Sequence, residues 1–302
     1  MPEAMTLLYF DDEAQFALRL AELAGLTPQV IERHRFPDGE LKLRLPPSLP
    51  SRVVILRSLH DPNEKLIELL LAAQTARELS AEHLTLVAPY LAYMRQDMAF
   101  KPGEVVSQRI VGKWLASLFD ALITVDPHLH RVATLEDAVP VREGVVLSGA
   151  PLLGDLIAQH HAHPFLMGPD NESAQWVAKA ALRHGFDHAV CQKVRHGDQA
   201  VDIALPLVDV RERAVVLLDD VASSGRTVAR AAQLLLAAGA ASVDVAITHA
   251  LFAGDAFQAL VDARVSQVWS TDCIAHPSNA VSVAPAIAHA LNNLNQQIVL
   301  RL

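Results

Sequence analysis

Cysteine is scarce in this sequence: Cys191 and Cys273 are the only two in 302 residues. Two thiols cannot build the disulfide framework of a small secreted scaffold, and no cysteine and histidine spacing predicts a structural zinc site. The N-terminus lacks a basic segment followed by an apolar core, and the apolar runs along the chain are short and interrupted. We therefore expect a cytoplasmic protein with neither a signal peptide nor a membrane span.

Positive charge is also limited, because 25 basic residues stand against 34 acidic ones and give a formal net charge of −9. Such a chain repels nucleic-acid backbones and anionic membranes, so we expect neither as a partner. A hydrophobic content of 51% with 20% charged residues is typical of a compact globular protein. The length exceeds what one hydrophobic core usually holds and predicts two domains of about 150 residues each.

Short apolar strands alternate with helical segments along the whole chain. The predicted strands cover residues 6–10, 53–56, 84–88, 121–125, 165–167, 188–191, 214–218, 243–249 and 268–270. The predicted helices cover residues 13–23, 64–79, 106–119, 152–159, 172–184, 228–238, 255–261 and 284–293, and the second of them has a strongly amphipathic pattern. This alternation implies an α/β protein with two domains, each a mainly parallel sheet flanked by helices.

The alternation is interrupted around residues 144–151, where turn-forming residues replace any long periodic element. We therefore predict a domain boundary at this point, with an N-terminal domain of residues 1–147 and a C-terminal domain of residues 148–302. The final helix is a candidate for packing back on the N-terminal domain.

The most informative stretch is residues 214–227, which read A-V-V-L-L-D-D-V-A-S-S-G-R-T. An apolar strand ends in Asp219 and Asp220, and a turn of small residues then leads into a helix. Backbone N–H groups at such a helix start can bind phosphate, while the two carboxylates suit sugar hydroxyls or a metal that bridges to the ligand. Paired acids at a strand end are common structural punctuation by themselves. The whole string nevertheless resembles the phosphoribosyl-diphosphate loop of type I phosphoribosyltransferase-fold proteins, and it predicts a site for a phosphorylated sugar.

Other polar strings stand at the ends of predicted strands, where ligands bind in open α/β sheets. Residues 89–101 hold Arg95 and Lys101, which suit a polyphosphate and equally suit solvent exposure. His128 and Asp170 suit a hard cation, although a histidine in such a place more often has a structural role. Residues 192–199, with the basic pair described below, form a polar segment with one glycine that we expect to be mobile.

In their order along the chain, these strings resemble the ribose-phosphate diphosphokinase family, also called phosphoribosyl-diphosphate synthetases. The similarity runs from about Arg35 to Pro285 and rests on R-F-P-D-G-E, P-Y-L-A-Y-M-R-Q-D, T-V-D-P-H, K-V-R, the stretch above, T-H-A-L-F-A-G and S-V-A-P. The resemblance implies two phosphoribosyltransferase-like domains, the first binding ATP and the second ribose 5-phosphate. It implies transfer of the diphosphoryl group of ATP to the anomeric hydroxyl of ribose 5-phosphate, which gives AMP and phosphoribosyl diphosphate. Magnesium as cofactor, a role in nucleotide biosynthesis and a homo-oligomer, either a dimer or a hexamer built of dimers, are implied as well.

The resemblance also assigns roles to individual residues. The ribose 5-phosphate residues are Asp219 and Asp220 on the ribose hydroxyls, with Ser223, Ser224, Gly225, Arg226 and Thr227 on the 5-phosphate. The ATP residues are Phe36, Asp38 and Glu40, which receive adenine and in the family usually serve a neighbouring subunit, and Arg95 and Gln96 near the phosphates. The magnesium positions are His128 and Asp170, and the catalytic residues of the mobile loop are Lys193 and Arg195, which suit a lid over transferring phosphate or an ordinary exposed basic pair.

The chain departs from the family pattern at two places. Many members have Asp-Thr where Ser223 and Ser224 stand and glycine where Arg226 stands, and residues 98–100 are apolar where many members have charged residues. The phosphate and ADP regulation of some members is therefore not predicted here. Two alternatives are a type I phosphoribosyltransferase, which predicts a single domain of about 200 residues, and a catalytically silent regulatory homologue, which predicts loss of the charged site residues.

Overall fold

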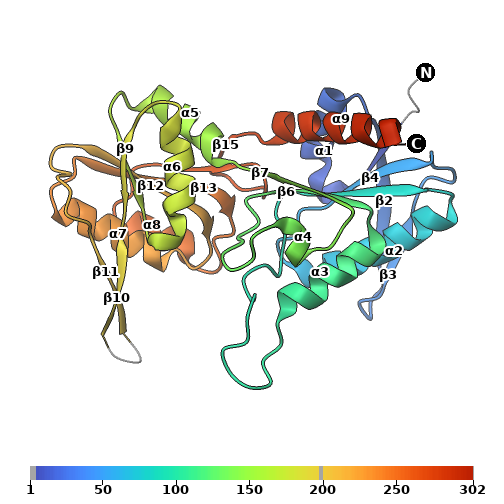
Figure 1. Cartoon of the computed structure of the whole chain (residues 1–302), viewed down its shortest axis with the longest axis horizontal. Coiled ribbons are helices and arrows are strands. Elements are labelled where there is room, and N and C mark those ends of the chain that lie inside the picture. Colours follow the sequence, from blue (N-terminus) through green and yellow to red (C-terminus); the bar gives the residue numbers. More distant parts are fainter. Residues whose placement is uncertain (1–4, 197–199, 302) are drawn as a thin grey trace. The chain divides into compact units, whose positions relative to one another are not determined.

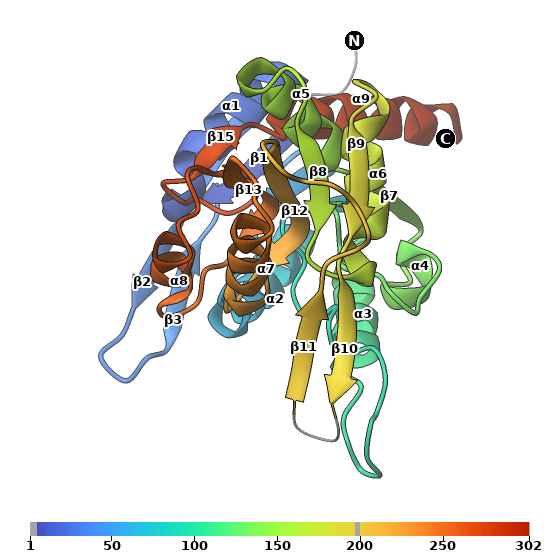
Figure 2. The same cartoon turned by 90° about the vertical axis from the view of Figure 1, so that its left-hand side faces the viewer.

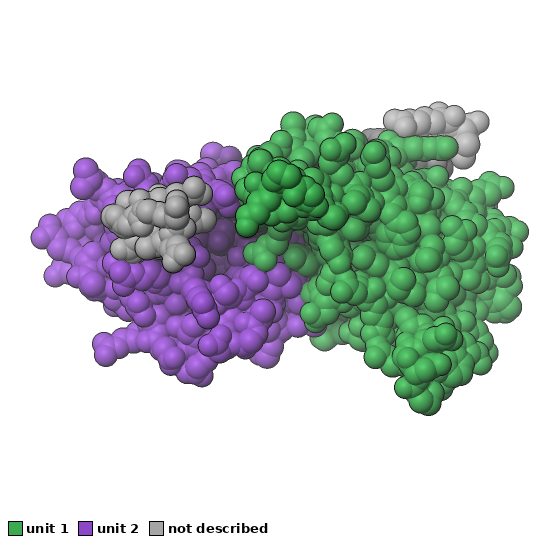
Figure 3. Space-filling view, turned by 90° about the horizontal axis from the view of Figure 1, so that it is seen from below, with its two compact units in different colours: residues 1–147, 283–302 green, residues 148–282 purple. Residues whose placement is uncertain are grey.

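The computed structural model of this protein describes residues 5–196 and 200–301. The chain divides into two compact units, Met1–Leu147 with Val283–Leu302, and Ser148–Ser282 (Figure 3). Both units are mainly parallel α/β sheets flanked by helices, which confirms the predicted fold class. Within the described residues, no helix is long and apolar enough to cross a bilayer.

The first unit contains a seven-stranded sheet in the order β3-β2-β1-β4-β5-β6-β7 (Figure 1). Its strands are β1 (Thr6–Phe10), β2 (Thr27–Arg35), β3 (Leu41–Arg44), β4 (Arg52–Leu56), β5 (His83–Ala88), β6 (Ala121–Val125) and β7 (Glu143–Leu147). All neighbours pair in parallel except β2 and β3, which form an antiparallel hairpin. The central strands β4 and β6 are buried along their whole length, as expected for apolar runs covered on both faces.

The helices of the first unit are α1 (Ala14–Ala24), α2 (Pro62–Glu78), α3 (Ser107–Leu118), α4 (Leu135–Ala138) and α9 (Ala284–Arg301), with the short 3-10 helix η1 (Asp11–Glu13) before α1. The C-terminal α9 packs beside α1 (Figure 1). Two sequence-based expectations are wrong in this unit. Residues 143–147 form strand β7, although turn formers were expected there, and α2 is not cleanly amphipathic, because its buried side includes Lys65 and Glu68.

The second unit contains a six-stranded parallel sheet in the order β15-β14-β13-β12-β8-β9. Its strands are β8 (Phe165–Gly168), β9 (Asp187–Val190), β12 (Ala214–Ala222), β13 (Ser242–Ala250), β14 (Val268–Thr271) and β15 (Asn279–Val281). Its helices are α5 (Ala150–His160), η2 (Asn171–Ser173), α6 (Ala174–Leu182), α7 (Arg226–Ala237) and α8 (Ala256–Asp262). Alternate residues of β12 enter two different apolar cores, Val215 on the side of α7 and Val216 on the side of α5 and α6.

A separate two-stranded ribbon follows β9, formed by β10 (Gln192–His196) and β11 (Ala200–Ala204) (Figure 2). The segment that we expect to be mobile therefore begins as a strand, paired antiparallel with register Lys193 to Ile203 and Arg195 to Val201. Residues 197–199 and the side chains of residues 193–202 lie outside the described part of the chain.

Candidate active site

The predicted phosphate loop is the connection between β12 and α7 in the second unit. Strand β12 continues through both acids to Ala222, and α7 begins at Arg226 after the turn formed by residues 223–225. Gly225 has a φ of 66°, and a Cβ atom on it would lie 2.8 Å from the carbonyl oxygen of Ala256. Only glycine fits this close approach, and it starts a helix of 12 residues whose first N–H groups and dipole favour an anion.

The chain after β13 holds this loop in place. The N–H of Phe252 donates to the carbonyl oxygen of Ala222, and the N–H of Ala253 donates to that of Ser223, both at 2.9 Å. Phe252 itself has a φ of 36°, an uncommon value for a residue with a side chain. The loop carbonyls are thus satisfied inside the protein, which fixes the backbone without using the N–H groups at the start of α7.

Three carboxylates gather beside the loop. Asp220 is 2% exposed, and Asp170, which follows β8, is 8% exposed. Asp219 is partly buried. Burial raises the pKa of Asp219 well above its usual value, and the charges of Asp220 and Asp170 raise it further. Such a cluster gains stability when it receives hydroxyl hydrogen bonds or a divalent cation.

The β2–β3 hairpin, which carries Phe36, Asp38 and Glu40, is preorganised by its own hydrogen bonds. The N–H of Phe36 donates to the carbonyl oxygen of Glu40 at 2.9 Å, and the N–H of Glu40 donates to Oδ1 of Asp38 at 3.2 Å. Gly39 takes a φ of 95° at the turn. Phe36 is 40% exposed and makes an edge contact with His34 at 4.9 Å between ring centres, so an aromatic face is available to a ligand.

Arg95 and Gln96 lie on the loop after β5 in the same unit. Arg95 is exposed, whereas the Gln96 carbonyl oxygen accepts a hydrogen bond of 3.2 Å from the N–H of Gln108 in α3. The next residue, Asp97, forms an ion pair of 2.8 Å with Arg131. These contacts tie the loop to α3 and to the chain that follows the predicted metal histidine.

The segment D-P-H-L-H follows β6 and has a strained backbone. Asp126 and His128 have φ values of 36° and 53°, in the left-handed region that residues with side chains seldom occupy. The Nε2 atoms of His128 and His130 are 2.7 Å apart, within hydrogen-bond distance, with one ring as donor and the other as acceptor. Backbone strain of this kind is concentrated at functional sites.

The structure brings some of the predicted residues together within a unit. Asp170, Asp219, Asp220 and residues 223–227 gather at the carboxyl ends of β8 and β12 in the second unit. The hairpin residues, Arg95 with Gln96, and His128 lie on three separate loops of the first unit. The predicted magnesium residues His128 and Asp170 therefore belong to different units. Lys193 and Arg195 lie on β10, and their side chains are outside the described residues.

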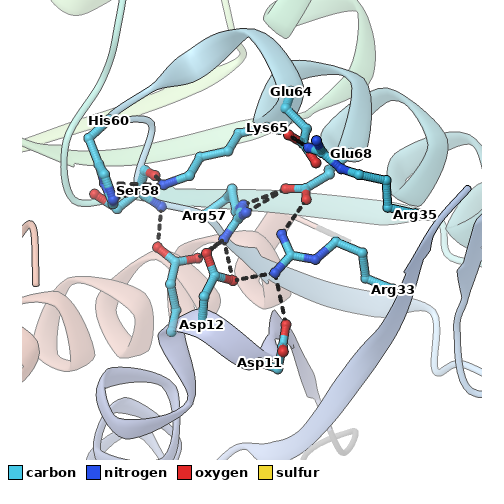
Figure 4. Close-up of polar contacts among 11 residues, drawn as sticks. Asp11, Asp12, Arg33, Arg35, Arg57, Ser58, His60, Glu64, Lys65 and Glu68 are labelled. Carbon is cyan, nitrogen blue, oxygen red and sulfur yellow. Dashed lines mark hydrogen bonds and ion pairs between the residues drawn. The ribbon is translucent and has the colours of Figure 1, made fainter. Parts of the chain in front are cut away.

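Sequence reasoning missed a cluster of charged residues at the base of the hairpin (Figure 4). Glu68 of α2 is fully buried and accepts hydrogen bonds from Nε of Arg57 at 2.8 Å and from Nη1 of Arg33 at 2.6 Å. Nη1 of Arg57 also donates to Asp12 at 2.8 Å. A glutamate inside the apolar run L-I-E-L-L-L, and an arginine directly after a buried strand, were the signals in the sequence.

Two further groups in this cluster titrate abnormally. Burial, and then the charge of Arg57, lower the pKa of Lys65 to about 8. Burial, and then the charge of Lys65, lower the pKa of His60 to about 4. Nζ of Lys65 donates to the carbonyl oxygen of Ser58 at 2.8 Å and lies 3.2 Å from the His60 ring, which is therefore neutral at physiological pH.

Comparison with known proteins finds a family match for each of the two units. Residues 5–118 match the N-terminal domain of ribose phosphate pyrophosphokinase, and residues 149–287 match the phosphoribosyl transferase domain. The ribose-phosphate pyrophosphokinase of Methanopyrus kandleri is 36% identical over 294 residues, which cover 96% of this chain and all of that protein. The chain belongs to the ribose-phosphate pyrophosphokinase family, as the sequence resemblance implied.

Other members of the family are similar over the same length. Ribose-phosphate pyrophosphokinase 1 of Archaeoglobus fulgidus is 35% identical over 95% of this chain and all of its own length. The crystal structure of phosphoribosylpyrophosphate synthetase from Mycobacterium smegmatis superposes with a TM-score of 0.85 at 24% identity and covers 98% of this chain and 100% of that one. The fold of this chain is thus also that of the Mycobacterium smegmatis synthetase.

Proposed function

We propose that this protein is an active ribose-phosphate pyrophosphokinase, which converts ATP and ribose 5-phosphate into AMP and phosphoribosyl diphosphate. The observation that carries the proposal is the three-carboxylate cluster beside a phosphate loop in a chain that also contains the family's N-terminal domain. A phosphate and a polyhydroxy sugar need these two features side by side.

In this proposal, residues 223–227 and the start of α7 bind the 5-phosphate, and Asp219 and Asp220 accept hydrogen bonds from the ribose hydroxyls. The ordered turn fixes the phosphate end of the sugar, so the anomeric hydroxyl is held in one orientation. Arg226, at the first position of α7 and exposed, adds a cation beside the loop where many relatives have none.

The ATP half of the site belongs to the first unit. We assign adenine to Phe36, Asp38 and Glu40 on the hairpin, and the polyphosphate to Arg95 and Gln96. We further propose a homo-oligomer, a dimer or a hexamer built of dimers, in which the hairpin serves a neighbouring subunit. Light scattering on the purified protein tests this assembly, and a monomer would contradict it.

The reaction forms a bond between the anomeric oxygen of ribose 5-phosphate and the β-phosphorus of ATP, and breaks the bond from that phosphorus to the α,β-bridging oxygen, which leaves with AMP. Negative charge develops on the departing AMP and on the non-bridging oxygens, while the sugar hydroxyl loses its proton, which is released with the products as H⁺. We assign Lys193 and Arg195 of β10 to neutralising this charge. Cations at that place lower the barrier more than a nucleophilic side chain would.

Magnesium suits the residues present, because Asp170 offers carboxylate oxygens, His128 offers a ring nitrogen as an additional ligand, and burial together with the charges of Asp220 and Asp170 raises the pKa of Asp219, so a nearby cation would stabilise its carboxylate. When bound, the ion would draw electron density from the phosphate oxygens. This chain orients the Asp170 carboxylate through the hydrogen bond of 2.9 Å from the N–H of Glu172 to Oδ1 of Asp170.

One assay tests the proposed function. The protein is incubated with magnesium, ATP and ribose 5-phosphate, and AMP and phosphoribosyl diphosphate are measured together. Equal amounts of both products are expected. If neither forms, and pyrophosphate is instead released from phosphoribosyl diphosphate and a purine or pyrimidine base, the protein is a phosphoribosyltransferase. No turnover in either assay would indicate a silent homologue.

A further inference from the structure

Two arginines on β2 reach the same helix. Arg33 and Arg35 are separated by one residue, so their side chains leave the strand on one side. Arg33 pairs with Glu68 at 2.6 Å and Arg35 pairs with Glu64, and these glutamates are one turn apart on one face of α2 (Figure 4). The two ion pairs form a short ladder between the end of β2 and α2.

The inner rung of this ladder is anchored from a third element. Glu68 is fully buried and also pairs with Arg57, which follows β4 and is 1% exposed. Arg57 in turn pairs with Asp12 of η1 at 2.8 Å. Arg33 therefore binds a carboxylate that Arg57, at the end of β4, already holds in place, and Arg33 itself is partly exposed, at 24%.

The ladder adjoins a cavity whose lining is balanced in charge. A cavity of about 430 Å³ adjoins the ladder and is lined by four basic and four acidic residues, so it presents no net charge to a ligand. The lining residues are Asp12, Arg33, Arg35, Arg57, Asp61, Glu64, Lys65 and Glu68. The charged side chains form ion pairs with one another, and these pairs join β2 and the end of β4 to α2.

The turn of the hairpin begins where the ladder ends. Phe36 directly follows Arg35, and beyond it an open groove of about 520 Å³ separates the turn, at Gly39 and Glu40, from Ile67 and Leu71 of α2. Because of this groove, the turn does not pack closely against Ile67 and Leu71 of α2. Beside the contacts of β3 with α2, the ladder is therefore the polar link between the base of this turn and that helix.

We propose that Arg33 and Arg35 are positioning residues for ATP, because they set the direction of the β2–β3 hairpin through Glu68 and Glu64. This inference rests on the proposed function, in which the hairpin receives adenine. Both arginines are engaged by glutamates of α2, so we expect their loss to weaken the binding of ATP and to leave the binding of ribose 5-phosphate unchanged.

The test is a comparison of steady-state kinetics among three proteins: the wild type, the double variant Arg33→Met with Arg35→Met, and Arg44→Met. Methionine retains most of the side-chain length without the charge, and Glu68 keeps Arg57 as a partner, so the double variant remains folded. Arg44→Met is the matched control, because Arg44 pairs with Glu32 on the neighbouring strand of the same hairpin and makes no link to α2. Circular dichroism spectra and melting curves verify that all three proteins are folded.

We expect the double variant to raise the KM for ATP about tenfold with the KM for ribose 5-phosphate within about twofold of wild type, and the control to match wild type in both. An active wild type with a double variant that changes neither KM, or changes both alike, overturns the positioning role and leaves the proposed function standing. A folded wild type without synthetase activity overturns the proposed function itself, and the positioning role with it.

Discussion

Arg57 donates a hydrogen bond of 2.8 Å to Glu68, and the two side chains are 1% and 0% exposed. A buried pair of this kind contributes little compared with well-packed apolar side chains of the same volume, because both ions lose their hydration. Removing one partner is a different matter, since the other ion then remains buried without compensation. The pair joins β4 to α2 and is the point from which the charged cluster of the first unit extends.

Replacing Arg57 with methionine should destabilise the protein strongly. Three carboxylates, those of Asp12, Glu13 and Glu68, lose a partner in this variant. We expect the free energy of unfolding to fall by about 3–5 kcal/mol, measured by urea denaturation with circular dichroism. Arg44→Met removes an arginine from an exposed pair with Glu32 and should leave the unfolding curve unchanged. A similar small change in the free energy of unfolding of both variants would contradict the predicted cost of leaving the buried carboxylates without Arg57.

His60 should make the protein acid-sensitive. Burial, and then the charge of Lys65, lower the pKa of His60 to about 4 in the folded state. Between pH 6.5 and 4 the unfolded chain therefore binds a proton that the folded chain does not, so the free energy of unfolding falls as the pH falls through this window. The loss is at most about 3 kcal/mol, and a His60→Gln variant should not show it.

The measurement is the free energy of unfolding at several pH values between 7 and 4, taken by urea titration. His188→Gln serves as the control, because His188 is exposed and its replacement should leave the profile unchanged. Identical pH profiles for wild type and His60→Gln would contradict the role of His60.

Gly225→Ala should weaken both the fold and the binding of ribose 5-phosphate. The new Cβ meets the carbonyl oxygen of Ala256 at 2.8 Å, and the residue has a φ of 66°. Gly185 has nearly the same φ, 65°, and open space around it. Gly185→Ala should therefore cost only the backbone term of about 1 kcal/mol.

We expect Gly225→Ala to exceed that loss of stability and to raise the KM for ribose 5-phosphate, with Gly185→Ala unchanged in KM. Melting temperatures and steady-state kinetics check both parts. Equal losses of stability and unaltered kinetics in the two variants would contradict the need for glycine at position 225, beside the carbonyl oxygen of Ala256.

Asp219→Asn should stabilise the free protein and impair it as an enzyme. The variant removes one of three crowded carboxylates, and the raised pKa of Asp219 shows that its charge is unfavourable in the folded state. We expect a higher melting temperature at neutral pH, together with weaker binding of ribose 5-phosphate. Asp209 provides the opposite case, because its hydrogen bonds from Arg211 lower its pKa to about 2, and Asp209→Asn should bring no gain in melting temperature. A lower melting temperature for Asp219→Asn would contradict the crowding of charge.

Lys193→Ala should lose most of the kcat, by about a hundredfold, while ribose 5-phosphate still binds. The reason is the loss of a cation where charge develops on the transferring diphosphoryl group. Single-turnover kinetics with ATP, and calorimetric titration with ribose 5-phosphate, separate the two effects. Lys179→Ala removes an exposed lysine of α6 and should retain full turnover. Near-normal turnover in Lys193→Ala would contradict the assignment of Lys193 to the catalytic step.

The sequence by itself determined the fold class and the strand, turn and helix of residues 214–237, because both depend on local order. Apolar strands such as β6 and β12 are covered on both faces, so they appear as continuous apolar runs, and the loop of residues 223–225 is defined by its small residues and by the strand before it. Strand β7 escaped prediction, since E-G-V-V-L is short, contains glycine and is only partly buried.

Only the tertiary structure decided which charges meet. Asp170 is 49 residues or more from the two acids of β12, and nothing in the spacing shows that β8 pairs with β12 and brings their carboxylates together. Arg33, Arg57 and Glu68 come from β2, from the end of β4 and from α2, and although the settings of Arg57 and Glu68 in the sequence are unusual, they do not show which charges pair. Their pairing is decided by strand order and by the burial of α2, because electrostatic interactions depend on distance in space and on exclusion of water, and a linear pattern contains neither.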